Sequence, residues 1–134
     1  MANTTFSGPV RSENGFEQIT KNATTGAVTV SATYGASITG GVQSLSGAGA
    51  VDLTNLVTEL TTTGTDALTL ADGTTSGQIK IVNMIVDGGD GTLTPTTFAN
   101  GTTITFDAVG ESATLVWNST VGWIASSTQG ATIA

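Results

Sequence analysis

The sequence contains no cysteine and no histidine, and only three of its 134 residues are lysine or arginine. The missing cysteines exclude disulfides, thiolate catalysis and zinc–thiolate sites. The missing histidines remove the commonest general base at neutral pH and the commonest transition-metal ligand. Ten aspartates and glutamates set the net charge at −7. This charge argues against nucleic-acid and anionic-membrane partners, because both are bound through lysine and arginine.

Long hydrophobic runs are also absent. The first residues, MANTT, have neither the basic nor the apolar region of a signal peptide, so we expect none. No stretch reaches the roughly 20 apolar residues that a membrane helix needs. Charged residues make up 10% of the chain, against about a quarter in ordinary globular domains. A chain with so little charge and a modest core is expected to bury further surface between subunits.

Threonine and glycine fill the gap that these absences leave, with 28 and 18 residues. β-Branched residues favour strands, and glycines next to Asn or Asp mark turns. Strand-like segments recur every 8–12 residues between such turns, which is typical of antiparallel sandwiches and barrels. The sequence therefore predicts an all-β protein, a compact antiparallel β-sandwich or barrel-like domain. We find no clean internal repeat, which argues against a regular solenoid.

The first 27 residues differ from the rest. Their two cations and two acids cancel, whereas residues 28–134 contain one lysine and eight acids. They contain the breakers Gly8-Pro9 and Asn14-Gly15 and show no sustained alternation of apolar and polar residues. We therefore predict an extended N-terminal arm over residues 1–27 and a β domain over residues 28–134.

Three segments of the predicted β domain are informative. Residues 28–34 alternate apolar and polar side chains, the pattern of a half-buried strand. Residues 78–86, QIKIVNMIV, are apolar on both faces towards their end and are predicted to form the most buried strand. In residues 52–60 the spacing of the leucines and Val57 fits a short helix that Asp52 could cap, but the many threonines favour a strand. Both interpretations of this segment stay open.

Candidate catalytic and metal sites have simpler interpretations. The turn at 87–91, DGGDG, resembles a calcium loop only faintly and is better explained as a tight hairpin turn. Pairs of carboxylates could serve a small hydrolase, but most acids stand beside glycine or threonine in turns. The serines lack a histidine base. We predict no catalytic residue, no cofactor and no metal site.

Trp117 and Trp123 flank a five-residue loop and should be cross-strand neighbours. Each indole buries about 200 Å². A place in the core is favoured over a role as a platform for a ligand.

Several phrases of the chain, in this order, resemble small structural proteins of tailed-bacteriophage virions. They are ELTTTG (59–64), ALTLADG (67–73), GQIK (77–80), DGGD (87–90), TLTP (92–95), GTTITF (101–106) and SATLVW (112–117). The similarity covers about the C-terminal two thirds and includes no catalytic signature. It is greatest to head decoration, or cement, proteins, and residues 5–16 look like the capsid-contacting segments of such proteins.

This resemblance implies a non-enzymatic homotrimer that binds the major capsid protein on the outer surface of the head and stabilises the shell. The alternative is a tail or fibre adhesion module that binds a host-surface glycan or protein; a small hydrolase and a non-viral scaffold or surface-layer module are further possibilities. The residues predicted to bind the partner are Phe6, Pro9, Val10, Arg11 and Phe16.

Overall fold

The computed structural model describes residues 16–34 and 41–134, which form strands and loops and no helix. No helix long and apolar enough to cross a membrane therefore occurs in these two ranges. The chain divides into two compact units, unit 1 (Met1–Ile38) and unit 2 (Thr39–Ala134).

Unit 1 contains a β-hairpin. Strands β1 (Phe16–Lys21) and β2 (Val28–Tyr34) pair antiparallel, with a register shift between Gln18 and Ile19. The predicted strand at 28–34 is present, but it pairs with residues that the sequence analysis assigned to the arm. The two units meet after Ile38.

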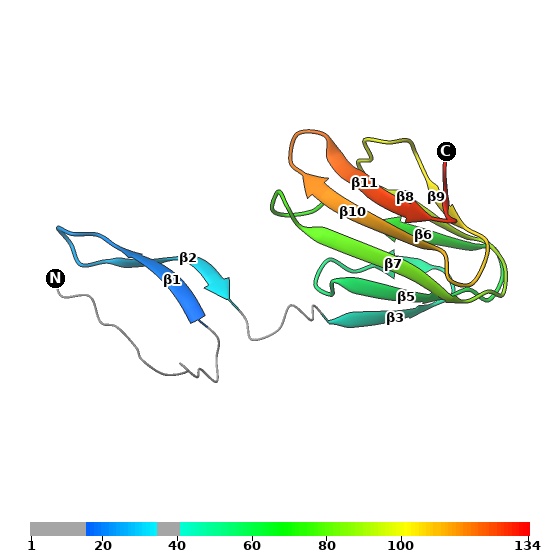
Figure 1. Ribbon diagram of the computed structural model, residues 1–134, viewed down its shortest axis with the longest axis horizontal. Helices are drawn as coiled ribbons and strands as arrows, with labels where there is room; N and C mark the ends of the chain where they lie inside the picture. The colour runs from blue at the N-terminus through cyan, green and yellow to red at the C-terminus, as the bar shows by residue number, and fades with distance from the viewer. Residues whose placement is uncertain (1–15, 35–40) are drawn as a thin grey trace. The chain divides into compact units, whose positions relative to one another are not determined.

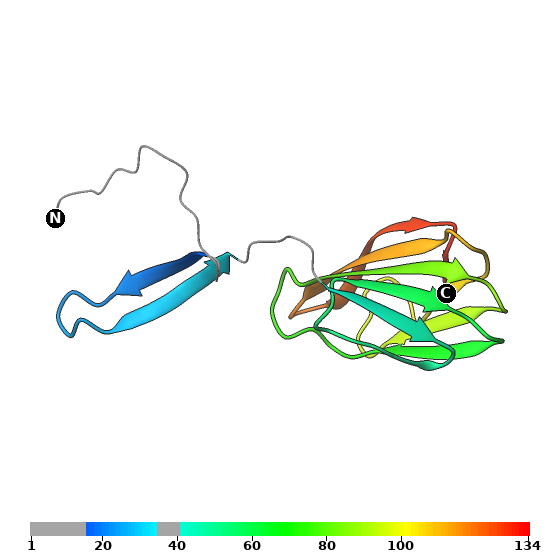
Figure 2. The ribbon, with the colours of Figure 1, turned by 90° about the horizontal axis from the view of Figure 1, so that it is seen from below.

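Unit 2 is a β-sandwich of two five-stranded sheets, as the sequence predicted, and its two layers are visible in Figure 2. The first sheet, at the front in Figure 1, has the order β11-β10-β7-β5-β3, and the second has the order β12-β9-β8-β6-β4. The strands are β3 (Val42–Ser46), β4 (Gly49–Val51), β5 (Val57–Thr61), β6 (Asp66–Leu70), β7 (Ile79–Val86), β8 (Gly91–Pro95), β9 (Ile104–Phe106), β10 (Ser112–Asn118), β11 (Gly122–Gln129) and β12 (Thr132–Ile133).

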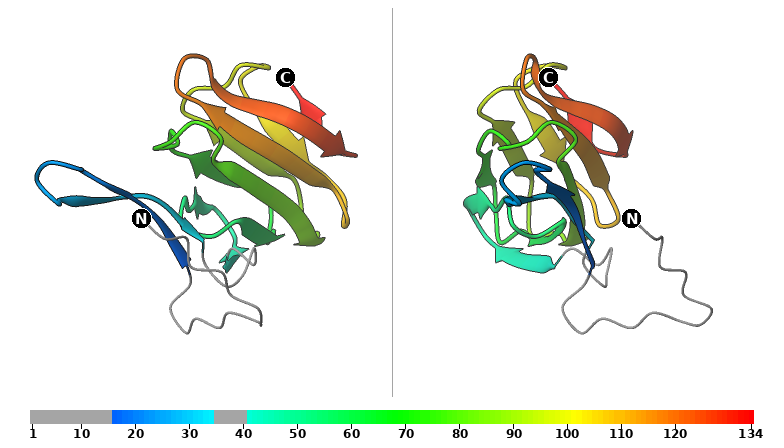
Figure 3. Two further views of the ribbon diagram at one scale, coloured as in Figure 1. Left: turned by 60° about the vertical axis from the view of Figure 1, so that its left-hand side comes forward. Right: turned by 90° about the vertical axis from the view of Figure 1, so that its left-hand side faces the viewer.

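The sheets are mixed, so the expectation of purely antiparallel sheets is wrong. From β3 to β8 the chain alternates between the two sheets, and β3, β5 and β7 pair parallel in one while β4, β6 and β8 pair parallel in the other. These six strands are three successive coils of a two-faced solenoid. Antiparallel strands β9 to β12 then complete both sheets, and Figure 3 shows the β10–β11 hairpin among them.

The coil escaped the sequence analysis because its turns differ in length. Val42 pairs with Val57, fifteen positions later, whereas Val57 pairs with Ile81, twenty-four positions later. Parallel strands also usually require a long crossover, often a helix. Here each coil crosses instead to the opposite sheet and back. A regular solenoid remains absent from the described residues, but a short irregular one is present.

The core lies between the two sheets and is built from side chains that stack from coil to coil. Leu60 and Met84 are neighbours in the first sheet, and Leu68, Leu93 and Ile104 are neighbours in the second. All five are at most 1% exposed. β7 is the central strand of the first sheet, in agreement with the prediction that residues 78–86 form the most buried strand.

The segment at 52–60 resolves the ambiguity of the sequence. Residues 52–56 form a bend, and the strand begins at Val57. Asp52 does cap this segment, because its Oδ1 accepts hydrogen bonds from the backbone N–H groups of Thr54 and Asn55 at 3.0 and 2.8 Å. The leucine spacing that suggested a helix belongs to this Asx turn and the strand after it.

Candidate interaction surfaces

The predicted partner-binding residues fall in unit 1, mostly outside the described part. Phe6, Pro9, Val10 and Arg11 lie outside the described residues. Phe16 is the first residue of β1 and pairs with Tyr34. Their role in binding a partner stays a prediction.

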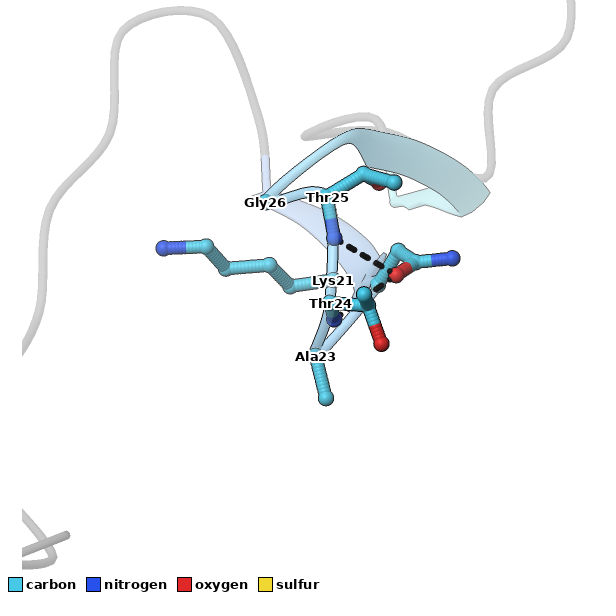
Figure 4. Close-up of a pocket in the computed structure, with 6 residues that line it drawn as sticks. Lys21, Ala23, Thr24, Thr25 and Gly26 are labelled. Atoms are coloured by element: carbon cyan, nitrogen blue, oxygen red, sulfur yellow. Dashed lines mark hydrogen bonds between the residues drawn. The ribbon is translucent and has the colours of Figure 1, made fainter.

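The turn of the unit 1 hairpin is ordered by a single side chain. The Oδ1 of Asn22 accepts hydrogen bonds from the backbone N–H groups of Thr24 and Thr25, both at 2.9 Å (Figure 4). Gly26 has a φ of 72°, in the left-handed region, and lets the chain return into β2. Figure 4 shows Lys21 extending away from this turn. Residues 21–29 are exposed throughout, so this turn offers an open surface and not an enclosed site.

Lys21 is the only exposed cation in the part of the chain that the structure describes, because Lys80, the other cation there, is 1% exposed. Unit 2 contains eight acids besides Lys80, so its side chains present negative charge alone to solvent. Arg11 and Lys21 both belong to unit 1. Attraction to an acidic partner must therefore come from unit 1.

Lys80 lies on the core face of β7, in phase with Val82 and Met84. Its Nζ donates a hydrogen bond to the backbone carbonyl of Asn55 at 2.8 Å and lies 3.6 Å from Oδ1 of Asp52. Burial lowers the pKa of Lys80, and the charge of Asp52 opposes that shift. Partial burial tends to raise the pKa of Asp52, but hydrogen bonds from Asn55 and Thr54 and the charge of Lys80 lower it. This pair holds the bend at 52–56 against the first sheet.

The two halves of this ion pair should respond unequally to mutation. Asp52→Ala leaves the buried ammonium of Lys80 without its countercharge and removes the cap of the bend, so we expect it to lower the free energy of unfolding by about 3 kcal/mol. Lys80→Met removes the desolvated charge itself, and we expect a change below about 1 kcal/mol. Urea denaturation of both variants measures the difference. Equal losses would show that the attraction between the two charges, and not the cost of burying one, dominates here.

The tryptophan pair lies in the core, as predicted. Trp117 on β10 and Trp123 on β11 are direct cross-strand partners, with ring centroids 5.4 Å apart and ring planes at 60°. Trp117 is 8% exposed and Trp123 is fully buried. The Nε1 of Trp123 donates a hydrogen bond to the carbonyl of Ala71 at 2.9 Å, which ties the hairpin to the chain that follows β6. Neither ring offers its face to a ligand.

The outer face of the first sheet carries an apolar patch that the sequence analysis did not identify. Cross-strand register joins Val42 to Val57 and Val57 to Ile81, and joins Ile79 to Val116 and Val116 to Ile124. Val42 is 54% exposed and Ile79 is 45% exposed, and the other four side chains are half-buried. We call these six residues the outer apolar patch: Val42, Val57, Ile79, Ile81, Val116 and Ile124.

Polar residues border the outer apolar patch along the strands. One register step beyond it, a polar row crosses the whole sheet, formed by Ser44, Glu59, Asn83, Ser112 and Gln129. Glu59 is the only charged residue of this row. The patch is therefore a charge-free half of a sheet face with a polar margin, the composition of an interface core with its rim.

The outer face of the second sheet is built differently. Its cross-strand neighbours are mainly threonines, which run from Thr92 on β8 to Thr105 on β9 and Thr132 on β12, and from Thr69 on β6 to Thr94 on β8. Valine and threonine have similar shapes and both suit strands. The aliphatic residues of the first sheet are therefore not required by strand formation alone.

Acidic clusters do not form a site in unit 2. The turn at 87–91 closes with a hydrogen bond from the N–H of Gly89 to Oδ1 of Asp87 at 2.9 Å, and Gly89 has a φ of 141°. Over residues 16–34 and 41–134, no three His, Cys, Asp or Glu residues gather as metal ligands would. Comparison of the chain with protein-family models and with curated proteins found no match.

Proposed function

We propose that this protein is a capsid decoration protein of a tailed bacteriophage, a homotrimer that binds the major capsid protein on the outer surface of the head and stabilises the shell without catalysis. The observation that carries the proposal is the division of charge between the two units. Unit 2 presents only negative side chains, while Arg11 and Lys21 belong to unit 1. This division supports attachment through unit 1 with the sandwich facing solvent.

The physical chemistry of such attachment is consistent with the fold. A trimer over a local three-fold axis of the shell matches symmetry to symmetry. Three copies of unit 1 act together, so a modest contact from each gives tight binding of the whole. An acidic sandwich on the outside keeps particles dispersed by mutual repulsion. The phrase-level resemblance to decoration proteins points in the same direction.

The experiment is addition of the purified protein to phage heads that lack it. We expect saturable binding and a higher temperature of head disruption after binding. Binding to tails or to host cells instead of heads would favour the alternative, an adhesion module of a tail or fibre. No binding to any part of the particle would overturn both virion functions.

A further inference from the structure

We propose that the outer apolar patch is the surface through which copies of this chain contact one another. The inference rests on the homotrimer within the proposed function and names the surface that forms it. Six neighbouring aliphatic side chains on one sheet face, two of them about half exposed in a single copy, are the largest apolar grouping that the strand register creates outside the core of unit 2.

The charges of unit 2 favour a second copy as the occupant. Two copies repel each other wherever acids face acids, and Lys80 cannot relieve this because it is buried. A lasting contact between copies therefore has to use a face without acids, and the patch is such a face. A basic protein partner would gain nothing here, since the patch offers no carboxylate for its cations. Nucleic acid and anionic lipid are opposed by the same net charge.

The edge of the first sheet extends this surface. Strand β3 forms that edge, and its sequence VQSLS contains no charge and no proline. Natural edge strands usually carry one of these features to prevent pairing with other strands. Val42 belongs both to this edge and to the outer apolar patch. The patch spans the sheet from β3 to β11, so one side of it can meet a different side on the next copy, as a closed three-fold ring requires.

The contrast with the second sheet provides the third argument. Both outer faces consist of β-branched residues, but the second sheet uses threonine where the first uses valine and isoleucine. Threonine would satisfy the strand and be better solvated. The apolar choice on one face alone indicates that this face is covered in the working protein.

Sedimentation velocity of the full chain at micromolar concentration tests the inference. We expect a trimer for the unmodified protein and a monomer for Ile79→Asp, with the dissociation constant raised at least about thirtyfold. Ile85→Asp is the matched control, because Ile85 lies on the same strand, is also 45% exposed and stands beyond the polar row. We expect that variant to remain a trimer.

A double variant, Val42→Thr with Ile79→Thr, keeps β-branched side chains at both positions. It should also dissociate, and if Ile79→Asp fails to fold, this variant decides. A trimer that survives it would overturn the inference and leave the trimer itself standing. An unmodified protein that is monomeric would overturn both. So would a monomer in which Ile79→Asp speeds proteolysis of residues 16–34, since unit 1 would then cover the face. A patch-dependent trimer that does not bind heads would remove the proposed function alone.

Discussion

Replacing Trp117 with alanine is expected to lower the free energy of unfolding by about 3–5 kcal/mol. The side chain is 8% exposed and packs edge-to-face on Trp123 at a centroid distance of 5.4 Å. Gly73 lies so close to the Trp117 ring that a Cβ at position 73 would clash with it, so the indole fills its site closely. Alanine would leave a cavity between the two sheets that this rigid surrounding cannot fill.

Urea denaturation measures this loss, and Val121→Ala supplies the control. Val121 lies in the loop between the same two strands and is 46% exposed, so its truncation should change stability by less than about 0.5 kcal/mol. Fluorescence gives an independent check in a Trp123→Phe background, where Trp117 should emit as a buried indole. Emission at the wavelength of water-exposed tryptophan would contradict the packing described above.

Deleting residues 2–38 should leave unit 2 folded and trimeric and abolish binding to heads. The deletion follows the boundary between the units and removes the hairpin whole, whereas a cut inside β1 would leave β2 without its partner. Unit 2 keeps its core and its outer apolar patch, so neither folding nor association should depend on unit 1. The head loses only the unit that carries Arg11 and Lys21. Normal binding of heads by the truncated protein would move the contact to the sandwich.

Point variants in the full chain refine this result. Arg11→Ala and Lys21→Ala should each weaken head binding by about tenfold, because a hydrogen bond to a charged group contributes about 1.5–3 kcal/mol. Thr24→Ala is the control within the same turn. Its backbone N–H still donates to Asn22, and its side chain makes none of the hydrogen bonds that order the turn.

Local pattern was sufficient to predict the fold class, the tryptophan pair and the central strand. The alternation of Ala113, Leu115 and Trp117 directly reports the face that β10 turns to the core, and all three are buried. The Asp52 cap was also visible, since the residue type and its position before a turn carry that information locally. Only the continuation as helix or strand depended on the rest of the sandwich.

Strand pairing could not be predicted in the same way. Whether β5 pairs with β7 in parallel depends on contacts between residues 24 positions apart, such as Val57 with Ile81. The unequal coils hide this relation from any search at a fixed period. Without the register, Val42, Val57 and Ile81 are separate residues of three segments, so the outer apolar patch had no signal in the linear sequence.

The burial of Lys80 did have a signal. Lys80 shares the alternation phase of Val82 and Met84, so a strand with those two residues inside must place the lysine inside as well. The sequence analysis used residue type, which normally places lysine at the surface, and gave less weight to phase. The countercharge at Asp52, 28 positions earlier, could be identified only once the fold joined the two segments.

The copy number of the protein in purified phage particles tests the central claim most directly. A decoration protein repeats with the lattice of the shell, so quantitative mass spectrometry against the major capsid protein should find hundreds of copies per particle. A few dozen copies or fewer, or copies that remain with isolated tails when heads are removed, would contradict decoration and identify a tail or fibre component.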